Sequence, residues 1–306
     1  MARGVLSFPL TAFHHDGTLD PDGFRAHVAD QLAAGPGALF PACGTGEFFS
    51  LDEDEYRTVV TVAVEEAARG EGAPAGDRVP VVAGTGYGWA QAARFARIAE
   101  EAGADALLVL PHYLVDAPQD GLVAQLEQLA ARTRLPLIAY QRGQVAYGVD
   151  ALRRIARVPN VIGLKDGHSD LDRLQRLTLA APDGFLFFNG AATAEIQARA
   201  YAAVGVPAYS SAVHAFAPEI AGAFRTALRE EDHATVDALL RAFYVPFVEL
   251  RDRAPGYAVS LVKAAARLRG RRVGPVRAPL TDPAPADLAA LKALLAAGLD
   301  LVGASL

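Results

Sequence analysis

Residues 135–165, LPLIAYQRGQVAYGVDALRRIARVPNVIGLK, contain one complete repeat of the pattern that indicates the fold class. This stretch holds two short apolar runs, Leu135 to Tyr140 and Val161 to Lys165. Between them, residues 149–157 carry apolar side chains at helical spacing. Two apolar strands joined by a helix form a βαβ unit, whose parallel strands are buried on both faces.

The same alternation of strand and helix continues on both sides of this stretch. Six further runs are typical of buried strands, at residues 5–8, 37–41, 79–83, 106–110, 185–188 and 206–209. Helical segments separate them, among them residues 52–69, 90–101, 119–132 and 192–203. Eight parallel strands with crossover helices are the number that closes a barrel. The chain is therefore predicted to be an α/β protein with a (β/α)8 TIM barrel.

A doubly wound open sheet is the alternative architecture. Such a sheet usually has a dinucleotide-binding motif, G-x-G-x-x-G, after its first strand. The spacing here is G-x-G-x-G, with glycines at Gly84, Gly86 and Gly88. A glycine turn after any barrel strand looks similar, so we favour the barrel.

The last third of the chain has a different pattern. Strand signals stop near residue 215, and helical segments follow at residues 218–229, 233–250, 258–268 and 284–295. A proline-rich loop precedes the last of them. We expect residues 1–214 to form the barrel with the active site and residues 215–306 to form a C-terminal helical region.

Composition narrows the classes of function. The 306 residues carry a formal net charge of -6, which disfavours a nucleic-acid partner. A local cluster of basic residues is interpreted as a solvated helix end: Arg267, Arg269, Arg271 and Arg272. Cys43 is the only cysteine, which excludes an internal disulfide and fits a cytoplasmic protein. No apolar stretch is long enough for a membrane span. We expect a small-molecule substrate.

Polar residues at the carboxyl ends of the strands are the candidates for chemistry, because barrel active sites lie there. Lys165 and Tyr140 end neighbouring strands, Thr45 follows the second strand, and Ser210 with Ser211 closes the eighth. A lysine at the end of an apolar strand is desolvated, which favours the neutral amine that attacks a carbonyl. From position alone, an ion pair of Lys165 with Asp166 or with another carboxylate at the barrel rim explains the lysine equally well.

The residues around Thr45 have both functional and structural interpretations. Gly44-Thr45-Gly46 offers backbone N–H groups and a hydroxyl that suit a carboxylate, although any tight turn contains such glycines. Glu47 is interpreted as a structural carboxylate and Cys43 as a buried hydrophobe. The histidines show no H-x-x-H or H-E-x-x-H spacing, so no metal site is predicted.

Four motifs, in this order, resemble the dihydrodipicolinate synthase and N-acetylneuraminate lyase superfamily over nearly the whole chain. They are Pro9-Leu-Thr-Ala-Phe13 with Asp16-Gly17, Gly44-Thr-Gly-Glu47, Tyr140, and Gly163-Leu-Lys165-Asp166. The resemblance implies that Lys165 forms the imine, that Tyr140 relays protons with Thr45, and that neither a metal nor an organic cofactor takes part.

Two departures from the superfamily pattern, together with Phe188-Asn-Gly-Ala and the C-terminal sequence, resemble a dehydratase branch acting on a keto-deoxy sugar diacid. The superfamily has a hydroxyl residue where this chain has Gly44, and its arginine is shifted to Arg142. The resemblance implies five substrate-binding candidates: Gly44, Arg142, Asn189, Gly190 and Ser210.

The resemblance also implies a homotetramer built as a dimer of dimers, with Tyr113 reaching the partner subunit near its active site.

Two other functions stay open. A class I aldolase or synthase would use the same lysine on pyruvate or another 2-keto-3-deoxy sugar acid. A barrel that binds a sugar acid without turnover would need no imine.

Overall fold

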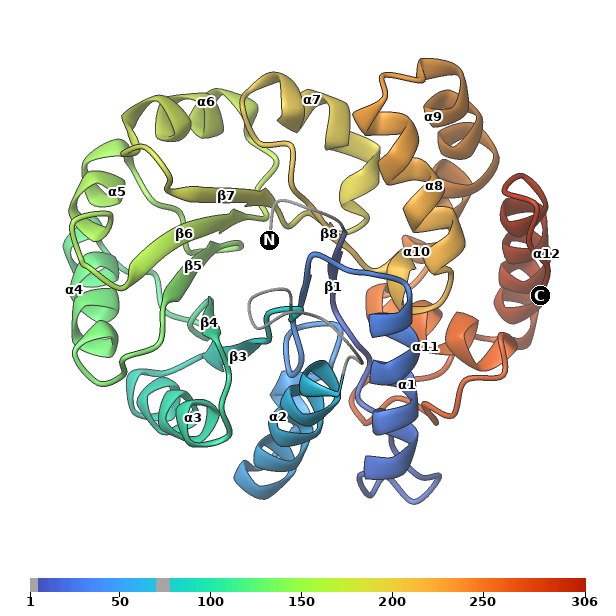
Figure 1. The fold of residues 1–306 in the computed structure, drawn as a ribbon, viewed down its shortest axis with the longest axis horizontal. Helices are drawn as coiled ribbons and strands as arrows, with labels where there is room; N and C mark the ends of the chain where they lie inside the picture. Colours follow the sequence, from blue (N-terminus) through green and yellow to red (C-terminus); the bar gives the residue numbers. More distant parts are fainter. Residues whose placement is uncertain (1–4, 70–77) are drawn as a thin grey trace.

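The computed structural model describes residues 5–69 and 78–306 and contains the predicted barrel (Figure 1). Its strands are β1 (Leu6–Ser7), β2 (Ala38–Leu39), β3 (Val82–Gly86), β4 (Ala106–Leu110), β5 (Leu137–Gln141), β6 (Val161–Asp166), β7 (Leu186–Asn189) and β8 (Ser210–Ser211). Strands β3 to β7 pair in sequence order, and β1 pairs with β2 and β8. Parallel bridges Leu39 to Val81 and Asn189 to Tyr209 join the two groups. All eight strands therefore form one closed ring, which rules out the open sheet.

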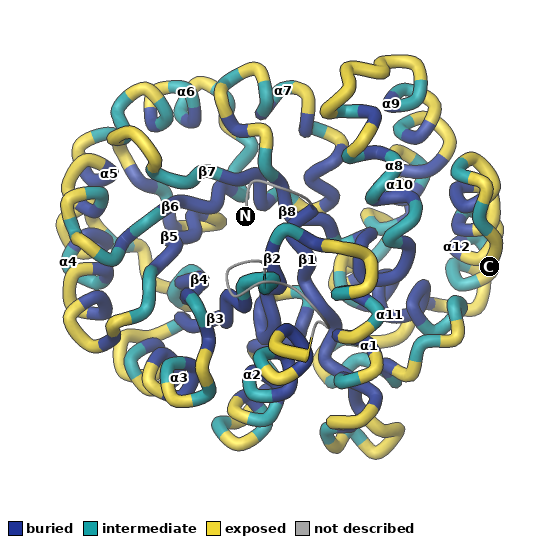
Figure 2. The backbone as a smooth tube through the Cα atoms, viewed as in Figure 1, coloured by how far each residue is buried: buried dark blue, intermediate teal, exposed yellow. Residues whose placement is uncertain are grey.

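One helix follows each strand and covers the outside of the ring. These helices are α1 (Pro21–Ala33), α2 (Glu53–Ala68), α3 (Trp89–Glu101), α4 (Gln119–Ala130), α5 (Val149–Ile155), α6 (Leu171–Ala180), α7 (Ala198–Ala203) and α8 (Pro218–Arg229). Figure 2 shows the ring of buried strands inside and exposed helix faces outside. Helices α1 and α6 are not among the helical segments predicted above, although Asp20 and Asp170 cap their first turns by accepting N–H bonds.

The glycines after residue 83 serve strand packing instead of nucleotide binding. Gly84 and Gly86 lie within β3, where a Cβ atom would stand 2.0 Å from the Ala42 carbonyl oxygen and 2.4 Å from that of Leu110. Only glycine lets the neighbouring backbones approach so closely. Two of the three glycines of the G-x-G-x-G pattern thus belong to the barrel wall, and Gly88 is the N-cap of α3.

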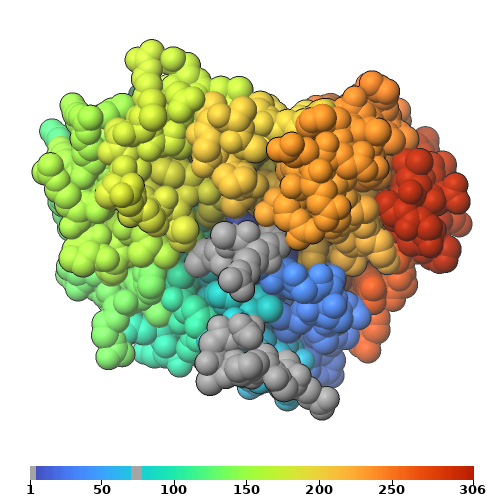
Figure 3. All heavy atoms as spheres, turned by 45° about the horizontal axis from the view of Figure 1, so that its top comes forward, coloured from blue at the N-terminus to red at the C-terminus, as the bar shows by residue number. Residues whose placement is uncertain are grey.

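The C-terminal helices are α9 (His233–Leu239), α10 (Val245–Arg251), α11 (Tyr257–Leu268) and α12 (Pro285–Asp300). A π-helical turn, η4 (Leu240–Tyr244), joins α9 to α10 just before Pro246, which lacks an N–H donor and pushes against the preceding turn. The space-filling view shows these helices against one side of the barrel (Figure 3).

A buried cluster joins this helical layer to the barrel. It contains Leu10 and Tyr209 together with residues of α8 to α12, such as Phe224, Phe243 and Leu291. The C-terminal helices consequently sit in a fixed position beside the strand ends. The expected division at residue 214 stays a prediction.

Candidate active site

A cavity of about 520 Å³ opens at the carboxyl ends of the strands. Of the residues predicted from the sequence, Gly44, Thr45, Tyr140, Arg142, Lys165, Gly190 and Ser210 all line it. Tertiary structure thus gathers residues from β2, β5, β6, β7 and β8 around one space. Six of the seven non-glycine residues with positive φ in the described chain lie in loops after these and neighbouring strands: Ala42, Glu47, Tyr87, Leu114, Ser169 and Thr193. Non-glycine residues with positive φ are strained, and such residues cluster in loops around active sites.

Lys165 is buried at the end of β6, with 6% of its surface exposed. Its Nζ atom lies 4.1 Å from the ring centre of Phe8 and 4.5 Å from that of Tyr140. Burial in this aromatic setting lowers the pKa of Lys165 to about 7, since desolvation penalises the ammonium form. Nearby Arg142 acts in the same direction. A substantial fraction of the amine is therefore neutral near pH 7.

The alternative in which Lys165 pairs with Asp166 is wrong. Successive residues of a strand point to opposite faces, so Asp166 points away from the cavity. Its carboxylate accepts hydrogen bonds from the Gln141 amide at 2.6 Å, from the Ser169 N–H at 3.2 Å and from the Tyr201 hydroxyl. Among the residues that the structure describes, no carboxylate forms an ion pair with the Lys165 amine.

Tyr140 stands beside Lys165, because the two residues are register partners on β5 and β6. Its hydroxyl donates to the Gly190 carbonyl at 3.4 Å and accepts from Nη1 of Arg142 at 3.1 Å. Burial raises the pKa of Tyr140, while the charge and hydrogen bond of Arg142 oppose that shift. The phenol is therefore held next to the amine by fixed partners.

Gly190 leaves the room that Lys165 needs. A Cβ atom at this position would stand 2.3 Å from Cε and 2.5 Å from Cγ of Lys165, a clash along the whole stem. Asn189 does not line the cavity, unlike the other substrate-binding candidates. Its amide donates to the Ala194 carbonyl and its oxygen accepts from the Ala191 N–H, so it holds the loop after β7 in shape.

The loop after β2 carries Gly44 and Thr45 at the cavity wall, and buried hydrogen bonds of Glu47 hold this loop in place. Glu47 is fully buried, and its carboxylate accepts hydrogen bonds from Nζ of Lys263 at 2.6 Å and from the Arg277 N–H at 2.9 Å. Both partners come from the C-terminal region. The carboxylate holds this loop in place, in line with the structural interpretation of Glu47.

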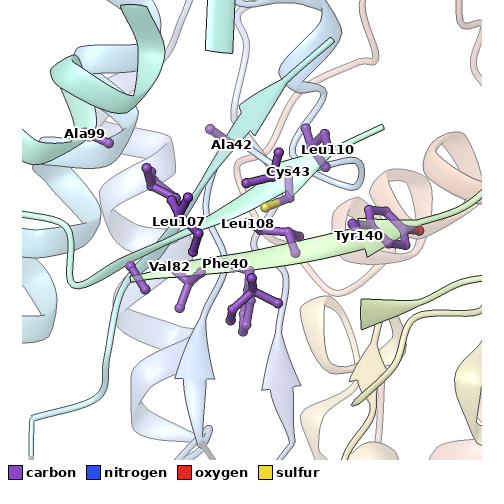
Figure 4. Close-up of a cluster of buried hydrophobic side chains, with 14 of the residues drawn as sticks. Phe40, Ala42, Cys43, Val82, Ala99, Leu107, Leu108, Leu110 and Tyr140 are labelled. Atoms are coloured by element: carbon purple, nitrogen blue, oxygen red, sulfur yellow. The ribbon is translucent and has the colours of Figure 1, made fainter. Parts of the chain in front are cut away.

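Other candidates from the sequence lie outside the cavity. Cys43 is buried among Leu108 and Leu110 (Figure 4), and burial raises the pKa of its thiol to about 12, so the thiol is neutral and unreactive. Within residues 5–69 and 78–306, no three His, Cys, Asp or Glu side chains gather in a way that could hold a metal ion. None of the described helices is both long and apolar enough to cross a membrane.

Each arginine of the cluster near residue 270 contacts a carboxylate of the described chain. Arg267 contacts Asp282, Arg269 contacts Glu219, Arg271 contacts Asp30, and Arg272 contacts Asp20. These contacts tie the end of α11 to α1 and α8. The exposed fractions of the four side chains run from 10% for Arg269 to 70% for Arg272, so the helix end is partly solvated and its charge is largely compensated within the molecule.

Sequence reasoning missed the contribution of the C-terminal helices to the cavity. Arg251 from α10 lines it, together with Phe247, Val259 and Val262. The Arg251 guanidinium donates to the Ala192 carbonyl and to the Thr193 hydroxyl, each at 3.0 Å, and pairs with Asp252. No local motif marks these positions, because they reach the site only through packing of α10 and α11.

Tyr113 lies at the mouth of the cavity after β4 and is 72% exposed. Leu114 and Val115 beside it are also exposed. Contact of Tyr113 with a partner subunit stays a prediction.

Comparisons with known proteins agree with this geometry. Residues 1–297 match the model of the Dihydrodipicolinate synthetase family. The "Probable 5-dehydro-4-deoxyglucarate dehydratase 2" of Streptomyces avermitilis is 82% identical over 100% of this chain and 90% of its own length. The "5-dehydro-4-deoxyglucarate dehydratase" of Pseudomonas putida is 43% identical over 96% of this chain and 95% of its own length.

Solved structures give the same result for the fold. Dihydrodipicolinate synthase from Bacillus clausii superimposes with a TM-score of 0.85 at 26% identity, over 95% of this chain and 96% of its own. The barrel prediction is confirmed. The family model covers residues 1–297, and the alignments with the Streptomyces and Pseudomonas relatives cover 100% and 96% of the chain. The chain therefore belongs to the dihydrodipicolinate synthetase family.

Proposed function

We propose that this protein is a decarboxylating dehydratase that converts 5-dehydro-4-deoxy-D-glucarate to 2,5-dioxopentanoate, CO2 and water through an imine of Lys165. The observation that carries the proposal is Lys165 itself, which is buried in an open cavity without a carboxylate partner in the described chain, with its pKa lowered to about 7 by burial. The names of the Streptomyces and Pseudomonas relatives support the substrate.

The charge of the cavity supports a doubly negative substrate. Two guanidinium groups line it, Arg142 and Arg251, beside the amine of Lys165, and no aspartate or glutamate of the described residues does. Guanidinium groups suit carboxylates because their N–H donors match both oxygens. A dicarboxylate gains more from this lining than a neutral sugar does.

The reaction needs one electron sink for two bond cleavages. The neutral Lys165 amine attacks the ketone beside one carboxylate, and loss of water gives an iminium that acidifies the adjacent CH2. Removal of one of these protons, with Tyr140 as the relay, gives an enamine that expels the hydroxyl group β to the original carbonyl as water.

The conjugated iminium then accepts the electrons of the bond to the far carboxylate, which leaves as CO2. Protonation and hydrolysis of the imine release 2,5-dioxopentanoate and regenerate the amine. The C–O electron pair leaves with the water, the electrons of the C–C bond to CO2 stay on the substrate, and no electrons pass to or from another molecule, so the proposal requires no metal and no organic cofactor.

The remaining side chains take binding roles in this proposal. Gly44 and Thr45 hold the carboxylate beside the ketone, and Ser210 and Gly190 border the carbon chain. Arg142 faces the second carboxylate. Asn189 supports the loop that carries Gly190, which is an indirect role. We further propose a cytoplasmic homotetramer in which the exposed Tyr113 meets a partner subunit.

Product analysis tests the function. The enzyme is incubated with 5-dehydro-4-deoxyglucarate, with other keto-deoxy sugar acids and with pyruvate plus aldehydes, and the products are identified by mass spectrometry. Release of CO2 and 2,5-dioxopentanoate from the first compound is expected. Retro-aldol cleavage or condensation of pyruvate would favour the aldolase or synthase alternative, and binding without turnover would favour the non-catalytic barrel.

A further inference from the structure

Arg142 makes an unusual contact for a residue expected to bind substrate, because its guanidinium already has a protein partner. Arg142 follows directly after β5, and a tight turn brings Val145 back to it, with the Val145 N–H donating to the Arg142 carbonyl at 3.1 Å. This turn directs the side chain back over the cavity. There Nη1 donates to the Tyr140 hydroxyl at 3.1 Å.

The surroundings of the Tyr140 hydroxyl leave Arg142 as its charged partner. A Cβ atom at Gly167 would stand 3.1 Å from the ring and 3.2 Å from the hydroxyl oxygen, so no side chain covers the phenol from that side. In the described part of the chain, Thr45 forms no hydrogen bond with it, and Gly44 carries no hydroxyl. The Gly190 carbonyl accepts from the phenol, and Arg142 donates to it.

Four groups that carry or can gain charge bear on Tyr140. Arg142 contacts its oxygen and Lys165 faces its ring from β6, while the charges of Asp166 and Cys43 act on its pKa. Burial, Asp166 and Cys43 raise the pKa of the phenol, and Arg142 lowers it. Since Cys43 is neutral, the balance lies between burial and Asp166 on one side and Arg142 on the other.

We propose that Arg142 is the positioning residue of Tyr140, holding the phenol oxygen beside Lys165 and stabilising its negative charge when the phenol gives up a proton. The proposal deepens the function proposed above and rests on the proton-relay role assigned there to Tyr140. The proton passes from the phenol to the reacting oxygen, and Arg142 stays protonated throughout. Four of its five N–H groups remain for the substrate carboxylate, so both roles are compatible.

The first experiment uses the substrate-free protein, so that its outcome does not depend on the identity of the substrate. Tyrosine labelled with ¹³C at Cζ is incorporated, the Tyr140 signal is assigned from Tyr140→Phe, and its pH titration is followed by NMR. In Arg142→Gln we expect the Tyr140 midpoint to rise by about one pH unit or more, or to leave the accessible range. Arg142→Lys, which keeps the charge, should restore part of the shift.

Arg251→Gln is the matched control, because Arg251 is the other arginine of the cavity and contacts the loop after β7 instead of Tyr140. Its Tyr140 titration should superimpose on that of the wild type. Superimposable Tyr140 curves for the wild type and Arg142→Gln would overturn the proposal, whatever reaction the enzyme catalyses.

Steady-state kinetics separates the two roles of Arg142. A residue that acts through Tyr140 lowers kcat, whereas one that only binds the substrate carboxylate raises KM. We expect Arg142→Gln to lower kcat by at least about tenfold, with an added effect in KM. A rise in KM with unchanged kcat would show that Arg142 only binds substrate and would also overturn the proposal.

Discussion

Two buried lysines of this barrel share burial and an aromatic neighbour, and they differ in their charged partners and in their access to the cavity. Lys165 is 6% exposed and Lys263 is fully buried, and their Nζ atoms lie 4.1 Å from the ring of Phe8 and 4.2 Å from the ring of Phe13. Burial lowers the pKa of both, to about 7 and about 8. Burial above an aromatic ring therefore does not by itself identify the reactive amine.

The difference lies in partners and access. Lys263 forms a buried ion pair with Glu47 at 2.6 Å and lies outside the cavity, while Lys165 lines the cavity. A paired ammonium has no free electron pair and no path to a ketone. Lys263 thus links the barrel to the C-terminal helices through its ion pair, whereas the Lys165 amine is accessible to a ketone in the cavity.

Trapping the imine gives the largest expected contrast between the two regions. Lys165, Lys263 and Lys292 are the lysines of the sequence, so peptide mapping after incubation with a 2-keto acid and borohydride separates them in one experiment. The ligand mass should appear on the peptide with Lys165. Lys165→Arg should lose this label and more than about 1,000-fold of the turnover, because guanidinium is not a nucleophile near pH 7. The control Lys292→Arg, at an exposed site, should keep the label on Lys165. A label on Lys263 would show that the paired lysine, and not Lys165, is the reactive amine.

Breaking the ion pair tests the other region. Glu47→Gln or Lys263→Met alone leaves one buried charge uncompensated and should lower the free energy of unfolding by about 3–5 kcal/mol. The double variant should lose clearly less than the sum of the two, since no lone charge remains. Denaturant unfolding of the four proteins gives the coupling. Additive losses would mean that the pair is not a unit.

Removing the Tyr140 hydroxyl tests whether this phenol moves protons in the reaction at Lys165. Tyr140→Phe should keep the imine but slow turnover by about 100-fold, because a positioned proton donor contributes roughly this much. Tyr147→Phe, a buried tyrosine outside the cavity, is the control and should turn over near the wild-type rate. Equal turnover of both variants would remove Tyr140 from the mechanism.

The pH dependence of labelling is the smallest expected effect. The neutral amine is the nucleophile, so the rate of imine formation should rise with pH and level off above the lowered pKa of Lys165, about 7. Between pH 6 and pH 8 the rise should be about tenfold, as the neutral fraction changes from roughly 9% to 91%. Initial rates of borohydride trapping measure it. A rate that is flat or falls over this range would contradict the desolvation of Lys165.

Much of the site was predictable from local patterns. Strand ends carry Lys165, Tyr140 and Ser210, and parallel strands of a closed barrel bring their ends together, so seven of the eight site candidates line one cavity. Asn189 is the exception, because a polar residue at a strand end turns either to the cavity or to its own loop, and sequence does not distinguish these. The roles of all eight stay predictions.

Other features had no local signal. The ion pair between Glu47 and Lys263 joins residues 216 positions apart, and Arg251 reaches the cavity from a helix outside the barrel strands. The contact between Arg142 and Tyr140 depends on a turn whose direction is set by backbone pairing with Val145.

The alternation of strands and helices, the barrel and the lysine at the end of β6 could be predicted from local sequence, because each depends on hydrophobic spacing or on a polar residue within one short segment. Tertiary structure alone decided which buried lysine is paired and which is open. The pKa and reactivity of an amine depend on the charges and space within a few ångströms of it, and those neighbours come from distant parts of the chain.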